Sequence, residues 1–251
     1  MSEDDKRQLW IKILFIVFIA IIIFLSIPFT EIEASGWGYK KNEQHKVPEI
    51  GEYENMIKDT NTYYVGNGKN VYLTFDAGYD NGVMPDILEV LREKKVQATF
   101  FVTGDFINRF TPLLKTIVND GHLVGNHSYE HKPIDAMSKE ELLNDLRKNE
   151  EVFFEKTNSV LSNCFRPPEG RFDEESLKNL SEAGYKTFFW SIALVDWNSN
   201  SIDSYKGIVE NLHDGAIILL HSVSKSNARD LGKIIDEVRN RGYEFKLLTE
   251  I

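Results

Sequence analysis

The chain has 251 residues, 42% of them hydrophobic, and is long enough to bury one large domain plus an appendage, or two small domains. Its formal net charge of −10 argues against nucleic acid as a partner, because phosphate binding requires a basic surface. The single cysteine, Cys164, excludes an intramolecular disulfide framework, and its apolar neighbour Phe165 indicates a core residue rather than a nucleophile.

The N-terminal segment is marked by an apolar run at residues 13–27, which follows basic residues and precedes Pro28. This pattern predicts a secretory signal over residues 1–34, with a cleavage site that ends at Ala34. The run is shorter than the roughly 20 residues of a spanning helix, but residues 9–11 extend it, so an uncleaved membrane anchor is the alternative. In both cases we expect the rest of the chain to be secreted or anchored on the outer face of the cytoplasmic membrane.

A polar stretch at residues 35–70 predicts an extended arm with one short helix at residues 53–58. The main domain then begins with the sequence Val-Tyr-Leu-Thr-Phe-Asp-Ala-Gly-Tyr over residues 71–79. This run predicts a buried strand that presents the carboxylate of Asp76 at its end and turns at Gly78. An aspartate at this position can also be no more than a turn cap.

From residue 71 to the C-terminus, strand-like and helix-like patterns alternate. We expect further strands at residues 98–103, 122–125, 164–166, 187–192, 216–220 and 245–248, and helices at residues 83–94, 112–120, 138–156, 174–183 and 225–241. Ser138 and Glu141 begin the third of these helices as a capping box. Repeated β-then-α units predict an α/β fold with a parallel sheet and right-handed crossovers, in one domain over residues 71–251.

Polar side chains follow the C-terminal ends of the expected strands. They are Asp76, His127, His131, Arg166, Asp196 and His221. In a parallel barrel these ends share one face, where active sites are found, so the pattern predicts an enzyme.

His127 and His131 are four residues apart, and on a helical turn this spacing puts both imidazoles on one side, where they can share a metal. Solvated surface histidines with the same spacing are common, and they are the alternative. Next along the chain, Pro167 and Pro168 fix an extended rim after Arg166. A fixed guanidinium is suited to hold a carboxylate, with Asp76 as its natural partner, although an arginine that only closes the barrel is possible.

His221 ends a strongly apolar strand, where it can act as an acid near neutral pH or can be a hydrogen-bonded core histidine. Asp196 is in position to orient this histidine. Trp197 can form a wall for a sugar ring, although such an aromatic residue is often part of the core. The candidate substrate contacts are Trp197 together with Tyr79, Pro167 and Pro168.

Five stretches, in this order, resemble the motifs of the polysaccharide deacetylases, the NodB-homology proteins of carbohydrate esterase family 4. They are residues 74–78 (Thr-Phe-Asp-Ala-Gly), 127–131 (His-Ser-Tyr-Glu-His), 166–170 (Arg-Pro-Pro-Glu-Gly), 196–197 (Asp-Trp) and 220–221 (Leu-His). The resemblance covers the chain from residue 71 to its end. It implies an irregular (β/α) barrel, as a single catalytic domain behind the N-terminal hydrophobic segment.

A closer resemblance, to the sporulation-type muramic-δ-lactam de-N-acetylases, rests on residues 37–41, 72–82, 100–104, 189–191 and 221–224. It implies removal of the acetyl group from N-acetylmuramic acid that lacks its peptide, after which the freed amine closes on the lactyl carboxyl. The implied partner is the peptidoglycan glycan strand on the cell-wall or forespore-cortex side, with the membrane as a second partner if the N-terminal segment is uncleaved.

The resemblance also implies roles for individual residues. Asp76 resembles the general base that activates water, and Arg166 the residue that positions this base. His127 and His131 resemble ligands of a divalent metal (Zn, Mn or Co). His221 resembles the general acid, tuned by Asp196.

The sequence departs from the family at Ala77, where most members have a second aspartate as the third metal ligand. A methyl group cannot coordinate a cation, so we expect weaker metal binding unless Asp80 substitutes. The muramic-lactam group is similarly irregular at this position. Two alternatives remain: a general peptidoglycan or chitin-type N-acetylglucosamine deacetylase, and a catalytically silent glycan-binding protein, against which the intact Asp76, Arg166 and His221 argue.

Overall fold

The computed structural model describes residues 3, 10, 35–40, 45–197 and 202–251. The chain divides into two compact units, residues 1–33 and residues 34–251. The apolar run predicted at residues 13–27 lies outside the described residues. Within the described part of the chain, every helix is too short or too polar to span a bilayer.

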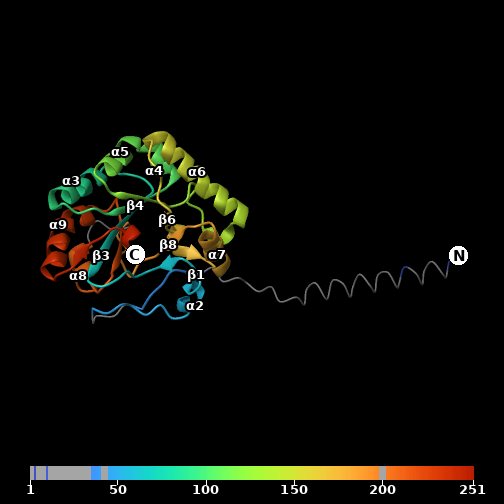
Figure 1. The fold of residues 1–251 in the computed structure, drawn as a ribbon, viewed down its shortest axis with the longest axis horizontal. Helices are drawn as coiled ribbons and strands as arrows, with labels where there is room; N and C mark the ends of the chain where they lie inside the picture. The colour runs from blue at the N-terminus through green and yellow to red at the C-terminus, as the bar shows by residue number, and fades with distance from the viewer. Residues whose placement is uncertain (1–2, 4–9, 11–34, 41–44, 198–201) are drawn as a thin grey trace. The chain divides into compact units, whose positions relative to one another are not determined.

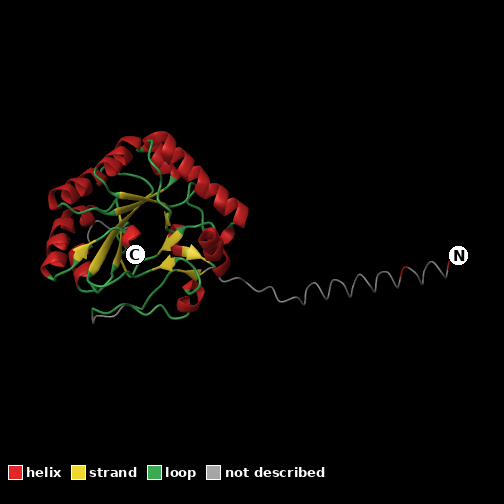
Figure 2. Cartoon of the chain, viewed as in Figure 1, coloured by secondary structure: helices red, strands yellow, loops and turns green. Residues whose placement is uncertain are grey.

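A curled, nine-stranded parallel sheet forms the centre of the second unit (Figures 1 and 2). Helices cover its outer side, as expected for an irregular (β/α) barrel. The strand order is β2 (Thr62–Tyr63), β8 (Lys186–Phe188), β6 (Cys164–Phe165), β5 (Leu123–Asn126), β4 (Thr99–Val102), β3 (Asn70–Ala77), β10 (Ile217–His221) and β9 (Ile192–Ala193), and β11 (Glu244–Phe245) also pairs with β3. The predicted fold class, an irregular barrel with one catalytic domain, is confirmed.

The central strand β3 is buried on both faces. Leu73 and Phe75 pack into the main hydrophobic cluster beneath the helices, whereas Tyr72 points into a smaller cluster inside the curl. A strand covered on both sides reads as a continuous apolar run, which is why this segment was recognisable in the sequence.

The long helices occur where the apolar periodicity predicts them. They are α3 (Met84–Lys94), α5 (Thr111–Asn119), α6 (Lys139–Thr157), α7 (Glu174–Glu182) and α9 (Lys225–Asn240). The capping box of Ser138 and Glu141 at the start of α6 is present. Two six-residue helices, α4 (Gly104–Arg109) and α8 (Ser204–Val209), were not predicted, because they are too short to show a periodic pattern.

The strand predicted at residues 187–192 is wrong in one respect, because it is interrupted. β8 pairs with β2 and β6, whereas β9 pairs with β10 at the other end of the sheet. Residues 189–191 bridge the two ends: the Phe189 amide donates to the Tyr63 carbonyl, and the Ser191 amide donates to the Ile217 carbonyl. The chain must leave one end of the sheet to reach the other, which breaks the strand and closes the barrel. The predicted strand at residues 245–248 is likewise shorter, since only β11 pairs and a 3₁₀ turn, Leu248–Glu250, comes after it.

The N-terminal arm packs within this unit. β1 (Ser35–Gly36) pairs antiparallel with β7 (Arg171–Phe172), and the predicted short helix is present as α2 (Tyr53–Ile57). Trp37 is 8% exposed and stacks on Phe189, with ring centroids 4.3 Å apart. The arm therefore packs against the bridge between β8 and β9, to which Phe189 belongs.

Candidate active site

The C-terminal edge of the sheet carries the predicted functional residues. Asp76 lies near the end of β3 and His221 ends β10, and the two residues are direct partners in the parallel register. Because neighbouring strands are about 4.8 Å apart, the ladder itself sets the spacing of these two backbones. The segments after β5, β6 and β9 bring His127, Arg166 and Asp196 to the same edge.

The carboxylate of Asp76 is almost enclosed, with 11% of its side chain exposed. Its Oδ1 accepts a hydrogen bond of 2.8 Å from Nη1 of Arg166, and its Oδ2 lies 3.6 Å from Nε2 of His127. Burial, the largest single influence, acts to raise the pKa of Asp76. The charges of Arg166, His127 and His221 together outweigh it, so the pKa lies below its ordinary value and the group is a carboxylate at neutral pH.

Arg166 is completely buried and held on several sides. Nε donates to the carbonyl of Phe188 (3.1 Å), and Nη1 donates to the hydroxyl of Thr74 (2.8 Å) as well as to Asp76. The guanidinium carbon lies 4.3 Å from the ring centroid of Phe101. A planar, multiply bonded guanidinium of this kind fixes the carboxylate it contacts, as predicted for this pair.

His127 and His131 lie close together, with ring centroids 5.0 Å apart. The prediction that they share a helical turn is wrong: residues 127–133 form a loop, in which Ser128 and His131 have positive φ values of 68° and 54°. Hydrogen bonds replace the helix, since Asp145 of α6 accepts from the amides of Tyr129 (2.7 Å) and Glu130 (3.0 Å).

The protonation state of His127 depends on its partner. Its Nδ1 is 2.9 Å from the carbonyl oxygen of Arg166, which can only accept, so Nδ1 carries the proton. Burial lowers the pKa of His127 to about 4, against the opposing charge of Asp76. At neutral pH its Nε2 is therefore a free lone pair on the side of Asp76.

The pKa of His221 is shifted in the opposite direction. Its Nδ1 donates to Oδ1 of Asp196 (2.6 Å), and its backbone amide donates to Oδ2 of the same carboxylate (2.8 Å). Burial, the largest influence, acts to lower the pKa of His221, but the hydrogen bond to Asp196 and the charges of Asp76 and Asp196 raise it above its ordinary value. Asn227 of α9, which was not predicted, donates to both Asp196 and the carbonyl of His221.

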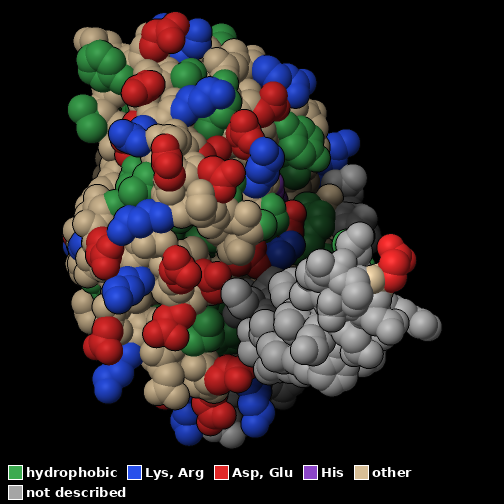
Figure 3. Space-filling model, turned by 90° about the vertical axis from the view of Figure 1, so that its right-hand side faces the viewer, with side chains coloured by type: hydrophobic (Ala, Val, Ile, Leu, Met, Phe, Trp, Pro, Cys, Tyr) green, Lys and Arg blue, Asp and Glu red, His purple; other side chains and the backbone are tan. Residues whose placement is uncertain are grey.

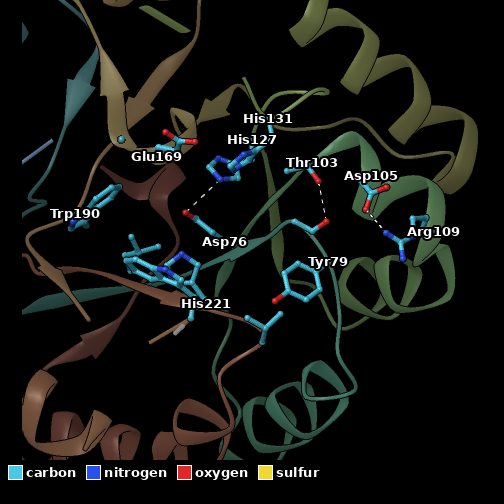
Figure 4. Close-up of a pocket in the computed structure, with 15 residues that line it drawn as sticks. Asp76, Tyr79, Thr103, Asp105, Arg109, His127, His131, Glu169, Trp190 and His221 are labelled. Atoms are coloured by element: carbon cyan, nitrogen blue, oxygen red, sulfur yellow. Dashed lines mark hydrogen bonds and ion pairs between the residues drawn. The ribbon is translucent and has the colours of Figure 1, made fainter. Parts of the chain in front are cut away.

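These groups border a cavity of about 650 Å³ (Figure 4). Of the predicted residues, those that line it are Asp76, Tyr79, His127, His131, Trp197 and His221. Pro167 and Pro168 are buried outside this lining, and the next two residues of their loop, Glu169 and Gly170, line it instead. The ring centroid of Trp197 lies 4.8 Å from that of His221.

Asp105, Arg109 and Trp190 also line the cavity and were not predicted. Asp105 and Arg109 belong to the unpredicted helix α4, whose start is capped by the hydroxyl of Thr103. The sequence Thr-Gly-Asp directly after a buried strand is a helix-start signal that could have indicated them. Trp190 lies in the bridge between β8 and β9.

The donors at this site fall short of a three-ligand metal centre. Ala77 is fully buried in the main hydrophobic cluster, and Asp80 accepts from the amides of Gly82 and Met84, so it caps the start of α3 instead of facing the cavity. Within the described ranges, no three His, Cys, Asp or Glu side chains are grouped to hold an ion. Among the described residues, the structure thus offers two imidazoles, and the carboxylate that approaches them is that of Asp76, which is already bonded to Arg166.

Comparisons with known proteins agree with this geometry. The family model described as polysaccharide deacetylase matches residues 64–188. The peptidoglycan-N-acetylmuramic acid deacetylase PdaA of Bacillus subtilis is 38% identical over 87% of this chain and 86% of its own length. Its solved structure has a TM-score of 0.82, with 87% of this chain and 96% of that chain covered.

Two further relatives differ in what their names report. A peptidoglycan-N-acetylglucosamine deacetylase of Bacillus cereus is 34% identical, over 74% of this chain and 89% of its own. A solved structure from Bacillus anthracis, described as a pseudoenzyme of carbohydrate esterase family 4, is 31% identical with a TM-score of 0.70, over 75% of this chain and 68% of that chain.

Proposed function

The chain belongs to the polysaccharide deacetylase family, whose members hydrolyse amide bonds, and we propose that it removes the acetyl group from peptide-free N-acetylmuramic acid in peptidoglycan. The observation that carries this proposal is the pairing of a held carboxylate, Asp76 with Arg166, and a held imidazole, His221 with Asp196, on adjacent strands at one cavity. The similarity to PdaA over most of both chains supports the choice of substrate.

In the proposed mechanism Asp76 is the general base. Its carboxylate takes a proton from a water molecule as the water oxygen attacks the acetyl carbonyl carbon, and Arg166 keeps the carboxylate ionised and oriented. Cleavage of the carbon–nitrogen bond leaves the electron pair on the sugar nitrogen. His221, protonated because its pKa is raised, gives that nitrogen a proton, and acetate and a free amine are released.

We propose that the aromatic residues hold the sugar beside this pair. Tyr79 and Trp197 are 51% and 57% exposed, and both line the cavity. Pro167 and Pro168 act from behind the lining, by fixing the loop that carries Glu169. The freed amine can then close on the lactyl carboxyl of the same residue to form muramic δ-lactam, which agrees with action on the cell-wall side during sporulation after export by the N-terminal segment.

The experiment that tests the function is mass analysis of peptide-free glycan strands after treatment with the purified protein. We expect loss of one acetyl group from muramic residues and none from chitin oligomers. Acetate release from chitin oligomers instead would favour the second candidate, an N-acetylglucosamine deacetylase, for which the similarity to the Bacillus cereus enzyme speaks.

The role of Asp76 has its own test. Asp76→Asn keeps the shape of the side chain but removes its basicity, so we expect kcat to fall about 10²- to 10⁴-fold while the folded state persists. Acetate release and the circular dichroism spectrum measure the two effects. A rate close to that of the unmodified protein would rule out Asp76 as the base, and an inactive unmodified protein would indicate a silent glycan-binding protein.

We further propose that a divalent cation (Zn, Mn or Co) binds at His127 and His131, with lower affinity than a three-ligand site. A chelator should then lower acetate release, and added Zn²⁺, Mn²⁺ or Co²⁺ should restore it. His131→Ala should prevent restoration at cation concentrations that suffice for the unmodified protein. Activity that is indifferent to the chelator would contradict this proposal.

A further inference from the structure

Arg109 is the cation that the cavity offers to a ligand. Arg166 also adjoins the cavity, but its side chain is fully buried and bonded to Asp76, Thr74 and backbone carbonyls. Arg109 instead lines the cavity with 64% of its side chain exposed. Among the described residues that line the cavity, it is the one lysine or arginine, beside the carboxylates of Asp76, Asp105 and Glu169.

The guanidinium of Arg109 is held by one hydrogen bond and has donors left over for a ligand. Nη1 donates to Oδ2 of Asp105 at 2.9 Å, one helical turn away in α4, and the guanidinium carbon lies 5.3 Å from the ring centroid of Phe110. Nε and Nη2 make no hydrogen bond to any other residue that the structure describes. The donors on these two nitrogens are therefore free to bind a planar anion in the bidentate manner of arginine.

Helix α4 is fixed relative to the base. It follows β4, the parallel neighbour of β3, and Thr103 at its start donates to the carbonyl of Gly78, two residues after Asp76. Figure 4 shows Asp105 and Arg109 on one side of Asp76 and Trp190 on the other. Tyr79, one of the two aromatic residues proposed to hold the sugar, lies on the Arg109 side of Asp76, so substituents of a sugar bound at Asp76 face a part of the cavity that Arg109 also lines.

The proposed substrate carries an anion at a suitable place. N-acetylmuramic acid differs from N-acetylglucosamine by a lactyl ether on the ring carbon next to the one that bears the acetamido group. With the acetamido group at Asp76, the lactyl carboxylate enters a cavity whose lining carries three carboxylates that repel it, those of Asp76, Asp105 and Glu169. The guanidinium of Arg109, with donors left over beside its bond to Asp105, is the group that makes the entry of the lactyl carboxylate favourable.

We propose that Arg109 binds the lactyl carboxylate of the muramic residue and is the specificity-determining residue that separates muramic from glucosamine substrates. This inference rests on the proposed function. Asp105 acts as the positioning residue for the guanidinium, since its single hydrogen bond holds one edge and leaves the other free.

The test compares two glycan substrates, peptide-free strands with free lactyl carboxylates and the same strands with those carboxylates converted to methylamides. For the unmodified protein we expect a higher kcat/KM on the free acid. In Arg109→Gln, kcat/KM on the free acid should fall about tenfold, through KM more than kcat, while the rate on the methylamide stays the same. Arg109→Lys keeps the positive charge but loses the bidentate geometry of the guanidinium. Its kcat/KM on the free acid should lie between those of the unmodified protein and Arg109→Gln.

Arg92→Gln is the matched control, because Arg92 is an exposed arginine that pairs with Asp120 outside the cavity lining. It should behave like the unmodified protein on both substrates. If the unmodified protein prefers the free acid and Arg109→Gln keeps that preference, the role of Arg109 is refuted and the proposed function stands. If the unmodified protein releases no acetate from muramic strands, the proposed function fails and takes this inference with it.

Discussion

At the scale of single residues, the surroundings of Asp76 and His221 shift their pKa values in opposite directions, as the proposed base and acid require. Asp76 keeps its charge because Arg166 is bonded to it, and the hydrogen bond and charge of Asp196 raise the pKa of His221. His127 is the most buried of the three side chains and remains neutral, because burial lowers its pKa to about 4 and its Nδ1 has only a carbonyl oxygen as partner. Burial is the largest influence on each pKa, and charged partners reverse its effect at Asp76 and His221 but not at His127.

These states predict the pH dependence of acetate release. The base must be ionised, so the acid limb should lie below the ordinary Asp pKa of 3.8, and the acid must be protonated, so the alkaline limb should lie above the ordinary His pKa of 6.5. Asp196→Asn removes the charge that raises the pKa of His221, and the alkaline limb should move to lower pH. A pH–rate profile of kcat/KM for both proteins measures this, and an unmoved alkaline limb in the variant would exclude His221 as the acid.

At the scale of elements, the bridge between β8 and β9 supplies Trp190 to one wall of the cavity, and the arm packs behind that wall. The indole of Trp37 stacks on Phe189 and donates to the carbonyl of Trp190 (2.9 Å). A Cβ at Gly170 would lie 2.8 Å from the Trp190 ring and 3.2 Å from Cβ of Trp37, so only glycine allows this contact. Since the carbonyls of Phe188 and Phe189 accept from Arg166, the wall also adjoins the residue that holds the base.

We therefore expect Trp37→Ala to lower the free energy of unfolding by about 3–5 kcal/mol and also to lower kcat/KM. Trp37→Phe keeps a ring for the stack and loses one hydrogen bond, which is worth about 1 kcal/mol. Val160→Ala, at a site 87% exposed, is the control and should change neither quantity. Urea titration and acetate release measure the two effects, and a stability loss without any change in kcat/KM would limit the arm to a structural role.

At the scale of the molecule, periodicity was enough to predict the parallel α/β architecture, because each long helix carries an apolar stripe and each core strand is an apolar run. Features that depend on long-range pairing could not be predicted in this way. The two-residue strands β1 and β7 and the bridge at residues 189–191 exist only because distant segments meet. The face of the molecule seen in Figure 3 shows basic and acidic side chains interspersed, so its described part has no basic patch that would mark a partner.

The site was more predictable than the loops that complete it. Asp76, Arg166, Asp196 and His221 each follow a recognisable strand, so their meeting is a consequence of the fold. The conformation of the loop after His127 could not be predicted in this way, because it is set by hydrogen bonds from backbone amides of the loop to Asp145. Arg109 was not predicted because its helix has six residues, too few for a periodic pattern, although the capping Thr103 marks the start of that helix.

The register that pairs Asp76 with His221 has a consequence for redesign. The proposed base and the proposed acid belong to the strand ladder, whereas Arg109, Tyr79 and Trp197 lie in the segments that come after strands. Loop grafts from other deacetylases can therefore exchange the recognised sugar without shifting the proton-transfer pair. In this fold the strands position the proposed catalytic residues, and the loops that follow them carry the proposed sugar contacts.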